Sequence, residues 1–171
     1  MKATCVFLAF FMALQFGFAQ PTKETQEAIS NFKFMEGMWK GIGWIKREEK
    51  KQAFRASETV TKKLDGSAIV FESFAVALED SNNIITNAKS ILSYNEGTKQ
   101  YTLRVTMSDG SVFEPDASLT QPFTFEWRLQ YTGGYLKYIH EVKDKIWMAK
   151  GFNSSDGINW NQIVESELSR Q

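Results

Sequence analysis

The sequence predicts an all-β protein: an antiparallel, up-and-down β-barrel of about ten strands, preceded by one short N-terminal helix. Apolar and polar residues alternate with a period of two along most of the chain, most clearly between Phe123 and Tyr131. Turn signals such as Asp65-Gly66 and Asp109-Gly110 separate the alternating runs. A sheet with one apolar face must cover that face, and closing the sheet on itself also removes its exposed edges. A sandwich of two sheets is the alternative.

Residues 1–19 are expected to be a secretory signal peptide. Lys2 gives a short positive n-region, the run 6–14 is apolar, and Gly17 and Ala19 are small residues before a cleavage site. The apolar run is short for a membrane-spanning helix, so we prefer a signal peptide to an uncleaved membrane anchor. Cleavage would give a mature chain that begins at Gln20, has no membrane span and is exported, either periplasmic or secreted.

Composition excludes several kinds of site from the mature chain. The only cysteine, Cys5, lies within residues 1–19, so residues 20–171 have no disulfide and no thiolate metal ligand. The chain has 20 basic and 20 acidic residues and no sustained basic face, so nucleic-acid binding is not expected. We predict neither a metal site nor a cofactor, because no spacing typical of metal ligands is present.

Residues 20–37 are predicted to form a helical segment, with the helix itself over 22–34. Thr22 is suited to the N-cap, and Glu24 favours the first turn. Ile29 and Phe32 share one face at a spacing of three, which predicts that the helix packs on the sheet through that face.

Residues 38–171 are predicted to form a single β-barrel domain. The alternating pattern predicts strands at 38–47, 52–64, 67–78, 84–94, 99–108, 111–117, 122–132, 135–143, 145–152 and 158–168.

The first strand combines tryptophan with glycine. In a strand through Trp39, the residues on the same face are Gly41, Gly43 and Ile45. Glycine in a strand often marks a bend or a close approach of another backbone. We therefore expect Gly41 and Gly43 to let the first strand coil, and Trp39 to fill the floor of the barrel.

The Gly37-Met38-Trp39 sequence is similar to the Gly-x-Trp entry of the calycin superfamily, which includes lipocalins and fatty-acid-binding proteins. The chain resembles a family of exported bacterial lipocalin-like proteins of unknown function. The segments that carry the resemblance are "MWKGIG" (38–43), "LDGSAIVFES" (64–73), "LSYNEGTKQYTLR" (92–104) and "SSDGINWNQIVESELSR" (154–170). The resemblance implies a barrel in which Arg170 packs across the floor residue Trp39; simple surface charge is the alternative for Arg170.

The resemblance also raises haem as a candidate ligand. Nitrobindin-type proteins, which are distantly similar at their first strand, bind haem through a histidine near the C-terminus. Here the last predicted strand contains no histidine, and the single histidine, His140, lies in an earlier strand. The sequence therefore disfavours haem.

The candidate ligand-binding residues are those expected on the inner, apolar faces of the strands. They are Glu58, Glu72, Tyr94, Tyr101, Phe125, Trp127, His140 and Trp160. A buried carboxylate has to be paired or protonated, and in a ligand cavity such a group can orient an apolar guest. For each of these residues the alternative is an ordinary core position with its polar group hydrogen-bonded inside the barrel.

Three functions are compatible with these residues. We favour a barrel that binds a small hydrophobic or amphipathic molecule. The first alternative is an enzyme of isomerase or hydrolase type that uses Glu58 and Glu72, with His140 as a possible third group. The second alternative is an envelope interaction module without ligand, which an apolar patch around outward-facing Trp44 and Trp147 would favour. The sequence does not indicate the oligomeric state.

Overall fold

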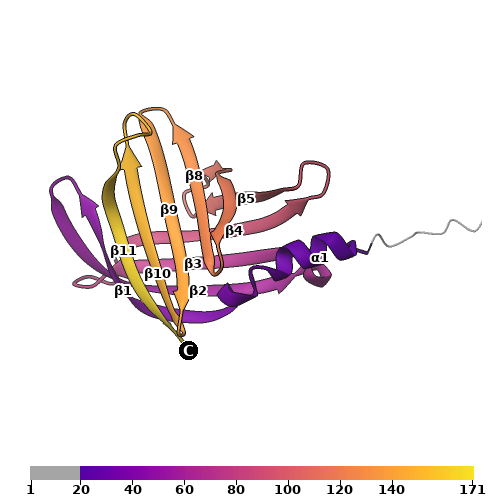
Figure 1. Cartoon of the computed structure of the whole chain (residues 1–171). Helices are drawn as coiled ribbons and strands as arrows, with labels where there is room; N and C mark the ends of the chain where they lie inside the picture. The colour runs from indigo at the N-terminus through magenta and orange to yellow at the C-terminus, as the bar shows by residue number, and fades with distance from the viewer. Residues whose placement is uncertain (1–19) are drawn as a thin grey trace, which may run out of the picture.

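The structure, a computed structural model, describes residues 20–171 (Figure 1). The expected signal peptide at 1–19 lies outside the described residues. The strands are β1 (Gly37–Arg47), β2 (Lys50–Lys63), β3 (Ala68–Ala77), β4 (Ile84–Asn95), β5 (Gln100–Met107), β6 (Val112–Phe113), β7 (Asp116–Gln121), β8 (Thr124–Tyr131), β9 (Gly134–Lys143), β10 (Ile146–Ser154) and β11 (Asn161–Arg170). The helices are α1 (Lys23–Ser30) and the short 3-10 helices η1 (Lys33–Met35) and η2 (Leu64–Gly66).

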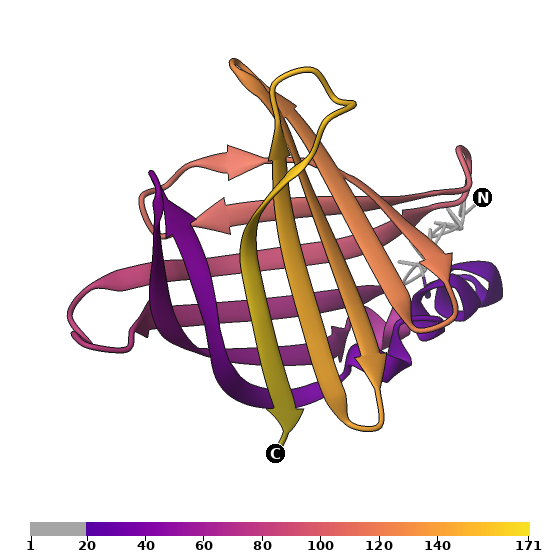
Figure 2. The same ribbon diagram turned by 60° about the vertical axis from the view of Figure 1, so that its left-hand side comes forward.

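The strands form one closed antiparallel barrel. Strand β1 pairs with both β2 and β11, and the pairing of β4 with β5 connects the two ends of the strand order. Figure 2 shows β9–β11, in orange to yellow, crossing in front of β2–β4, in purple to magenta. The prediction of an up-and-down barrel is therefore confirmed, and the sandwich alternative is wrong. Ten strands build the wall, because β6 adds only Val112 and Phe113 beside β5.

The predicted strand at 111–117 is instead two strands, β6 and β7. Glu114 and Pro115 separate them, and a proline has no N–H to donate to a strand ladder. As a result β5 pairs with β6 through only two residue pairs and with β7 through only two more. This seam has fewer paired residues than any other junction between strands of the barrel wall.

The last strand begins at Asn161, three residues later than predicted. The cause is the side chain of Asp156, whose Oδ1 accepts hydrogen bonds from the backbone N–H groups of Ile158 and Asn159, each at 2.8 Å. These bonds hold the segment before Asn161 in a turn, where it cannot pair with β10.

Helix α1 starts where the sequence predicts and ends four residues earlier. The Thr22 hydroxyl accepts a hydrogen bond from the N–H of Thr25 at 3.1 Å, which caps the helix. After Ser30 the chain continues into η1, so that Ile29, Phe32 and Met35 are all completely buried against the sheet. The helical segment therefore closes one end of the barrel, which we call the closed end.

Trp39 forms the floor beside this segment. Its ring is completely buried, and its Nε1–H donates to the carbonyl of Met35 at 2.8 Å. The guanidinium carbon of Arg170 lies 4.3 Å from the centroid of the Trp39 ring. The same guanidinium donates from Nη2 to the carbonyl of Phe34 at 2.6 Å. Arg170 thus connects the end of β11 to both the floor and the helical segment.

Gly41 and Gly43 lie directly against the backbone of β11, the strand that pairs with β1. A Cβ on Gly41 would lie 1.9 Å from the carbonyl oxygen of Glu167, and one on Gly43 would lie 2.4 Å from that of Glu165. Both distances are far below van der Waals contact. Neither position can hold a side chain without moving the backbone of β11.

Candidate ligand-binding cavity

The barrel encloses a cavity of about 290 Å³. Its floor includes Met35 and Trp147, next to Trp39 at the closed end. At the other end it reaches Ile85 at the start of β4 and Met107 at the end of β5. We call this second end, opposite helix α1, the mouth. The volume lies just below the usual range for ligand pockets, about 300–1,000 Å³.

Most of the cavity wall is apolar and aromatic. The larger contributors are Phe54, Phe71, Leu103, Val105, Phe125 and Trp127. Trp127 stacks on Tyr138 with ring centroids 4.4 Å apart, and Phe125 stacks on Phe71 at 6.2 Å. These rings hold one another in fixed orientations and present their faces as a preformed aromatic surface.

Glu58 is the carboxylate of the cavity. Its Oε2 accepts a hydrogen bond from the Ser73 hydroxyl at 2.6 Å, across the β2–β3 pair. Burial raises the pKa of Glu58 to about 7, and the bond from Ser73 offsets part of this increase. At neutral pH the carboxyl group therefore occurs in both its protonated and its ionised form, and it lines the cavity.

His140 lies on the opposite wall, on β9. Its Nδ1 accepts a hydrogen bond from the Nε1–H of Trp147 at 3.2 Å, which assigns the proton of the neutral ring to Nε2. Burial lowers the pKa of His140 to about 4. Its ring also stacks on Phe125, with centroids 5.6 Å apart. The imidazole is therefore uncharged at neutral pH.

The cavity contains few charges. Glu58, Tyr138 and His140 are the titratable side chains among the described residues that line it, and no lysine or arginine is among them. Burial raises the pKa of Tyr138 to about 12, so its hydroxyl stays protonated. Glu58 is thus the one group in the lining that can carry charge near neutral pH.

Four of the eight predicted site residues line this cavity: Glu58, Phe125, Trp127 and His140. The other four lie elsewhere. Tyr94 and Tyr101 are near the closed end, where the Tyr101 hydroxyl donates to the carbonyl of Ala28 at 3.1 Å and Tyr94 lies 3.3 Å from a carboxylate oxygen of Glu24. These two tyrosines attach helix α1 to the sheet.

Glu72 points out of the barrel, contrary to the prediction. Its side chain is 54% exposed, and Oε1 lies 2.9 Å from Nζ of Lys89 on the outer face of β4. Strand β3 carries apolar residues on both faces. Val76, on the outer side, is as buried as Ala75 on the inner side. The alternation in this strand therefore did not show which face was inside.

Trp160 also lies outside the cavity. It precedes β11, and the ammonium of Lys137 lies 4.3 Å from its ring centroid. The turn at Asp156 delays the start of the strand, so the face that Trp160 was expected to share with Gln162 does not form.

Sequence reasoning missed Tyr138, Ser73 and Trp147, all of which line the cavity. Tyr138 shares the face of His140, so the alternation in β9 could have found it. Trp147 was expected to face outward but is 3% exposed and stacks edge-on against Trp39. The interaction-module alternative therefore loses the apolar patch that Trp44 and Trp147 were expected to form.

The outward position of Glu72 removes the pair of interior carboxylates that the enzyme alternative requires. Within residues 20–171 no group of three or more histidine, cysteine, aspartate or glutamate side chains is placed to hold a metal ion. Over the same residues, no helix is long and apolar enough to cross a membrane.

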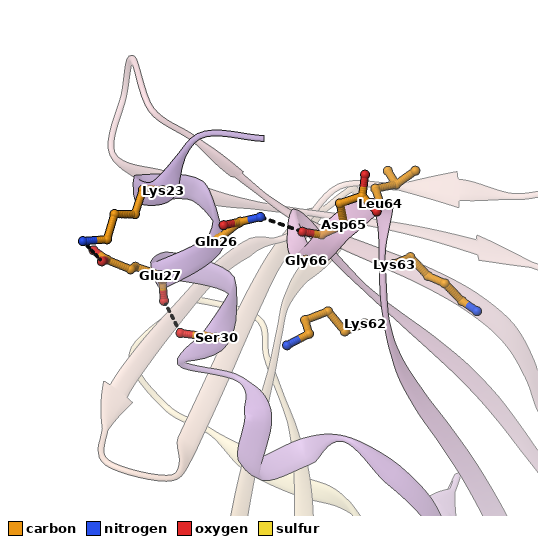
Figure 3. A pocket seen from close by; sticks show the side chains of 9 residues that line it. All are labelled: Lys23, Gln26, Glu27, Ser30, Lys62, Lys63, Leu64, Asp65 and Gly66. Atoms are coloured by element: carbon orange, nitrogen blue, oxygen red, sulfur yellow. Dashed lines mark hydrogen bonds and ion pairs between the residues drawn. The ribbon is translucent and has the colours of Figure 1, made fainter. Parts of the chain in front are cut away.

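A second hollow lies on the surface between α1 and η2 (Figure 3). It is larger than the cavity, at about 860 Å³, but it is polar and open to solvent. Gln26 donates to the carbonyl of Asp65 across it at 2.8 Å, and Lys23 pairs with Glu27 along the helix. This hollow lies along the junction between the helix and the barrel.

Comparisons with known proteins identify the fold. No family model matches the chain, and no curated protein matches it in sequence. Two solved structures are similar. Rv2717c from M. tuberculosis has a TM-score of 0.61 at 13% identity, covering 88% of this chain and 99% of that one. The S-type phycobiliprotein lyase CPES from Guillardia theta has a TM-score of 0.57 at 11% identity, covering 88% and 98%. The chain therefore shares the fold of both, a closed antiparallel barrel of ten strands.

Proposed function

We propose that this protein binds a small, largely apolar molecule inside its barrel. The observation that carries the proposal is the cavity of about 290 Å³, with its apolar and aromatic wall and a few buried polar groups. Pockets of this composition bind apolar ligands through surface burial and orient them through the polar groups. The similarity of the barrel to lipocalin-like proteins supports the proposal but does not identify the ligand.

The test is to fill the cavity and measure binding. Ala88 faces the cavity from β4, so Ala88→Phe places a ring in the ligand volume. Binding of the neutral fluorophore N-phenyl-1-naphthylamine to the wild-type protein should be saturable at one site. The substitution should weaken binding at least tenfold, which corresponds to about 1.4 kcal/mol or more.

Ala53→Phe is the matched control, because Ala53 is exposed on the outer face of β2. This variant should bind the fluorophore like the wild type. Equal binding by the Ala88→Phe variant and the wild type would place the fluorophore outside the barrel and contradict the proposal.

We further propose that the chain is exported and that residues 1–19 are removed. The positive Lys2, the apolar run 6–14 and the small residues Gly17 and Ala19 support this. Expression of the full chain in a bacterial host, followed by fractionation and intact-mass measurement, tests it. We expect a species that begins at Gln20 in the periplasm or the medium. Recovery of the full-length chain from the cytoplasm alone would exclude export.

A further inference from the structure

We propose that the molecule bound in the cavity carries a protonated amine, and that Glu58 is the residue that binds this amine. The inference rests on the proposed ligand-binding function and concerns the head group of the ligand. It follows from the position of Glu58, from the lack of positive charge around it and from the aromatic wall.

Glu58 has an unused acceptor that faces the cavity. Ser73 donates to Oε2, whereas Oε1 accepts no hydrogen bond from any side chain or backbone group in the described part of the chain. Oε1 is not fully enclosed by the protein, and Glu58 lines the cavity, so this oxygen is open to it. An ammonium group placed there can donate to Oε1 and bring the charge that a buried carboxylate needs.

The lining supplies no competing positive charge. It contains neither lysine nor arginine among residues 20–171, and His140 is neutral because its Nδ1 accepts the Trp147 N–H. A ligand carboxylate would therefore meet Glu58 with no cation to separate the two negative charges. The charge in the lining thus disfavours fatty acids and favours amines.

The aromatic wall also favours a cation. Phe71, Phe125, Trp127 and Tyr138 line the same cavity as Glu58. The faces of aromatic rings attract cations, and the attraction is larger where water is excluded. A neutral ligand would gain apolar contacts with these rings, whereas an ammonium group gains the electrostatic attraction as well.

Amine binding should release a proton. Burial raises the pKa of Glu58 to about 7, so the empty protein is partly protonated at neutral pH. The other titratable groups that face the cavity, His140 and Tyr138 on β9, do not change charge there, with pKa values of about 4 and about 12. An alkylammonium stays charged, since amines of this type titrate near pH 10. Binding it would stabilise ionised Glu58 and expel the proton.

The experiment compares three ligands of equal chain length: octylamine, 1-octanol and octanoate. Isothermal titration calorimetry at pH 7 should show octylamine binding at least tenfold more tightly than octanoate. Glu58→Gln keeps an acceptor for Ser73 and should weaken octylamine at least tenfold, while 1-octanol changes less than about twofold. Glu72→Gln, on the outer face of the neighbouring strand, is the matched control and should bind all three like the wild type.

The outcomes separate the two proposals. Saturable binding of 1-octanol, combined with octanoate binding as tightly as octylamine, would overturn the amine proposal and leave ligand binding intact. Unchanged octylamine affinity in the Glu58→Gln variant would also overturn it. If none of the three ligands binds while N-phenyl-1-naphthylamine still does, the amine proposal fails and ligand binding stands; if the fluorophore also fails to bind, both proposals fail. Octylamine enthalpies measured in two buffers should differ in the direction of proton release, and equal enthalpies would contradict the role of Glu58.

Discussion

Among the residues of the cavity, Glu58 has the environment least favourable to its own charge. A carboxylate in bulk water is solvated on both oxygens, whereas Glu58 has one hydrogen bond, from Ser73, and otherwise faces a largely apolar cavity. Its pKa of about 7 expresses this loss of solvation. Keeping a buried carboxylate lowers the free energy of unfolding of the whole protein. Such a cost is common at binding sites.

Glu58→Gln should therefore stabilise the protein, and more so at higher pH. The folded protein holds the Glu58 proton up to a pKa of about 7, against 4.5 for the free group, so its stability falls as pH rises through that window. Relative to wild type, the variant should gain about 3 kcal/mol at pH 8 and about 1 kcal/mol at pH 5. Urea unfolding at both pH values measures the difference.

Glu72→Gln is the control for that measurement. The hydrogen bond from Lys89, together with its charge, lowers the pKa of Glu72, so this group contributes stability above its ordinary pKa rather than below it. The exposed pair should be worth little, and its loss should act in the opposite direction to Glu58→Gln. A gain in stability at pH 8 from both variants would show that the effect of Glu58→Gln is not specific to the cavity.

Arg170→Ala should remove two contacts at the closed end. The guanidinium covers the Trp39 ring at 4.3 Å and donates to the Phe34 carbonyl at 2.6 Å. We expect a loss of about 1–2 kcal/mol in the free energy of unfolding. Arg170→Lys keeps the charge but not the planar, forked donor, so it should recover only part of this loss. Full recovery by lysine would mean that charge alone matters at this position.

At the residue level, alternation identified inward positions where only one face of a strand is apolar. Glu58 lies in β2, whose other face carries Arg55 and Thr59, and the pattern placed it correctly. Glu72 lies in β3, where both faces are apolar, and the pattern failed there. The difference is physical: the outer face of β3 carries Phe74, which is 43% exposed, and Val76, so an apolar side chain in this strand does not indicate which face is inside.

At the level of elements, the segment α1–η1 does more than precede the barrel. Phe32 is completely buried and packs edge-on against both Tyr101 and Phe125, with ring centroids 5.0 and 5.2 Å away. Phe125 in turn lines the cavity. The segment α1–η1 therefore supports the cavity wall from the closed end.

Phe32→Ala should weaken both the fold and the site. Removing a fully buried phenylalanine ring costs about 3–5 kcal/mol, because it loses apolar contacts and leaves a void. Binding of the neutral fluorophore should also weaken, since Phe125 loses its support. Phe123→Ala is the control: Phe123 is 59% exposed at the same end and should cost less than about 1 kcal/mol. A similar loss for both variants in urea unfolding would refute the special role of Phe32.

The limits of the elements were predicted less well than their existence. The N-cap at Thr22 and the first strand carry strong local signals, and both formed where expected. The late start of β11 depends on how the Asp156 side chain turns back onto its own backbone, which alternation does not reveal. Residues 118–121 of β7 were not predicted, because they form a strand by pairing with β8.

At the scale of the whole molecule, closure of the barrel is uneven. Most neighbouring strands share long ladders, such as the eleven residue pairs between β1 and β2. The seam between β5 and β6–β7 has two pairs on each side of Glu114 and Pro115. A wall with so few hydrogen bonds opens more easily than the rest.

Hydrogen exchange should therefore begin at this seam. We expect the amides of β6 and of the first residues of β7 to exchange before those of β1, β2 and β11 under native conditions. Peptide-level mass spectrometry measures the order directly. If the amides of β1 exchanged first, the strand pairing that opens most easily would be at β1, and the prediction for the β5/β6–β7 seam would be wrong.

The fold as a whole was predictable because it depends on a pattern that every strand repeats. The cavity was predictable only in part, because its shape depends on which aromatic side chains fill the barrel and which leave space. Trp39 fills the floor, whereas Trp127 stacks on Tyr138 against the wall, and the sequence treats both simply as inward tryptophans. The two similar structures share the barrel at only 13% and 11% identity, so the architecture does not depend on one particular sequence.

Both described ends of the chain lie at the closed end: Thr22 starts helix α1, and Gln171 donates its backbone N–H to the carbonyl of Met38 at 2.9 Å. An affinity tag or a surface linker joined to either of these ends would attach the protein to a support through its closed end. The mouth would then face the solution, so immobilised copies could be used as ligand sensors without an engineered attachment point. A tag on the β1–β2 hairpin, at the mouth, would obstruct the entrance instead.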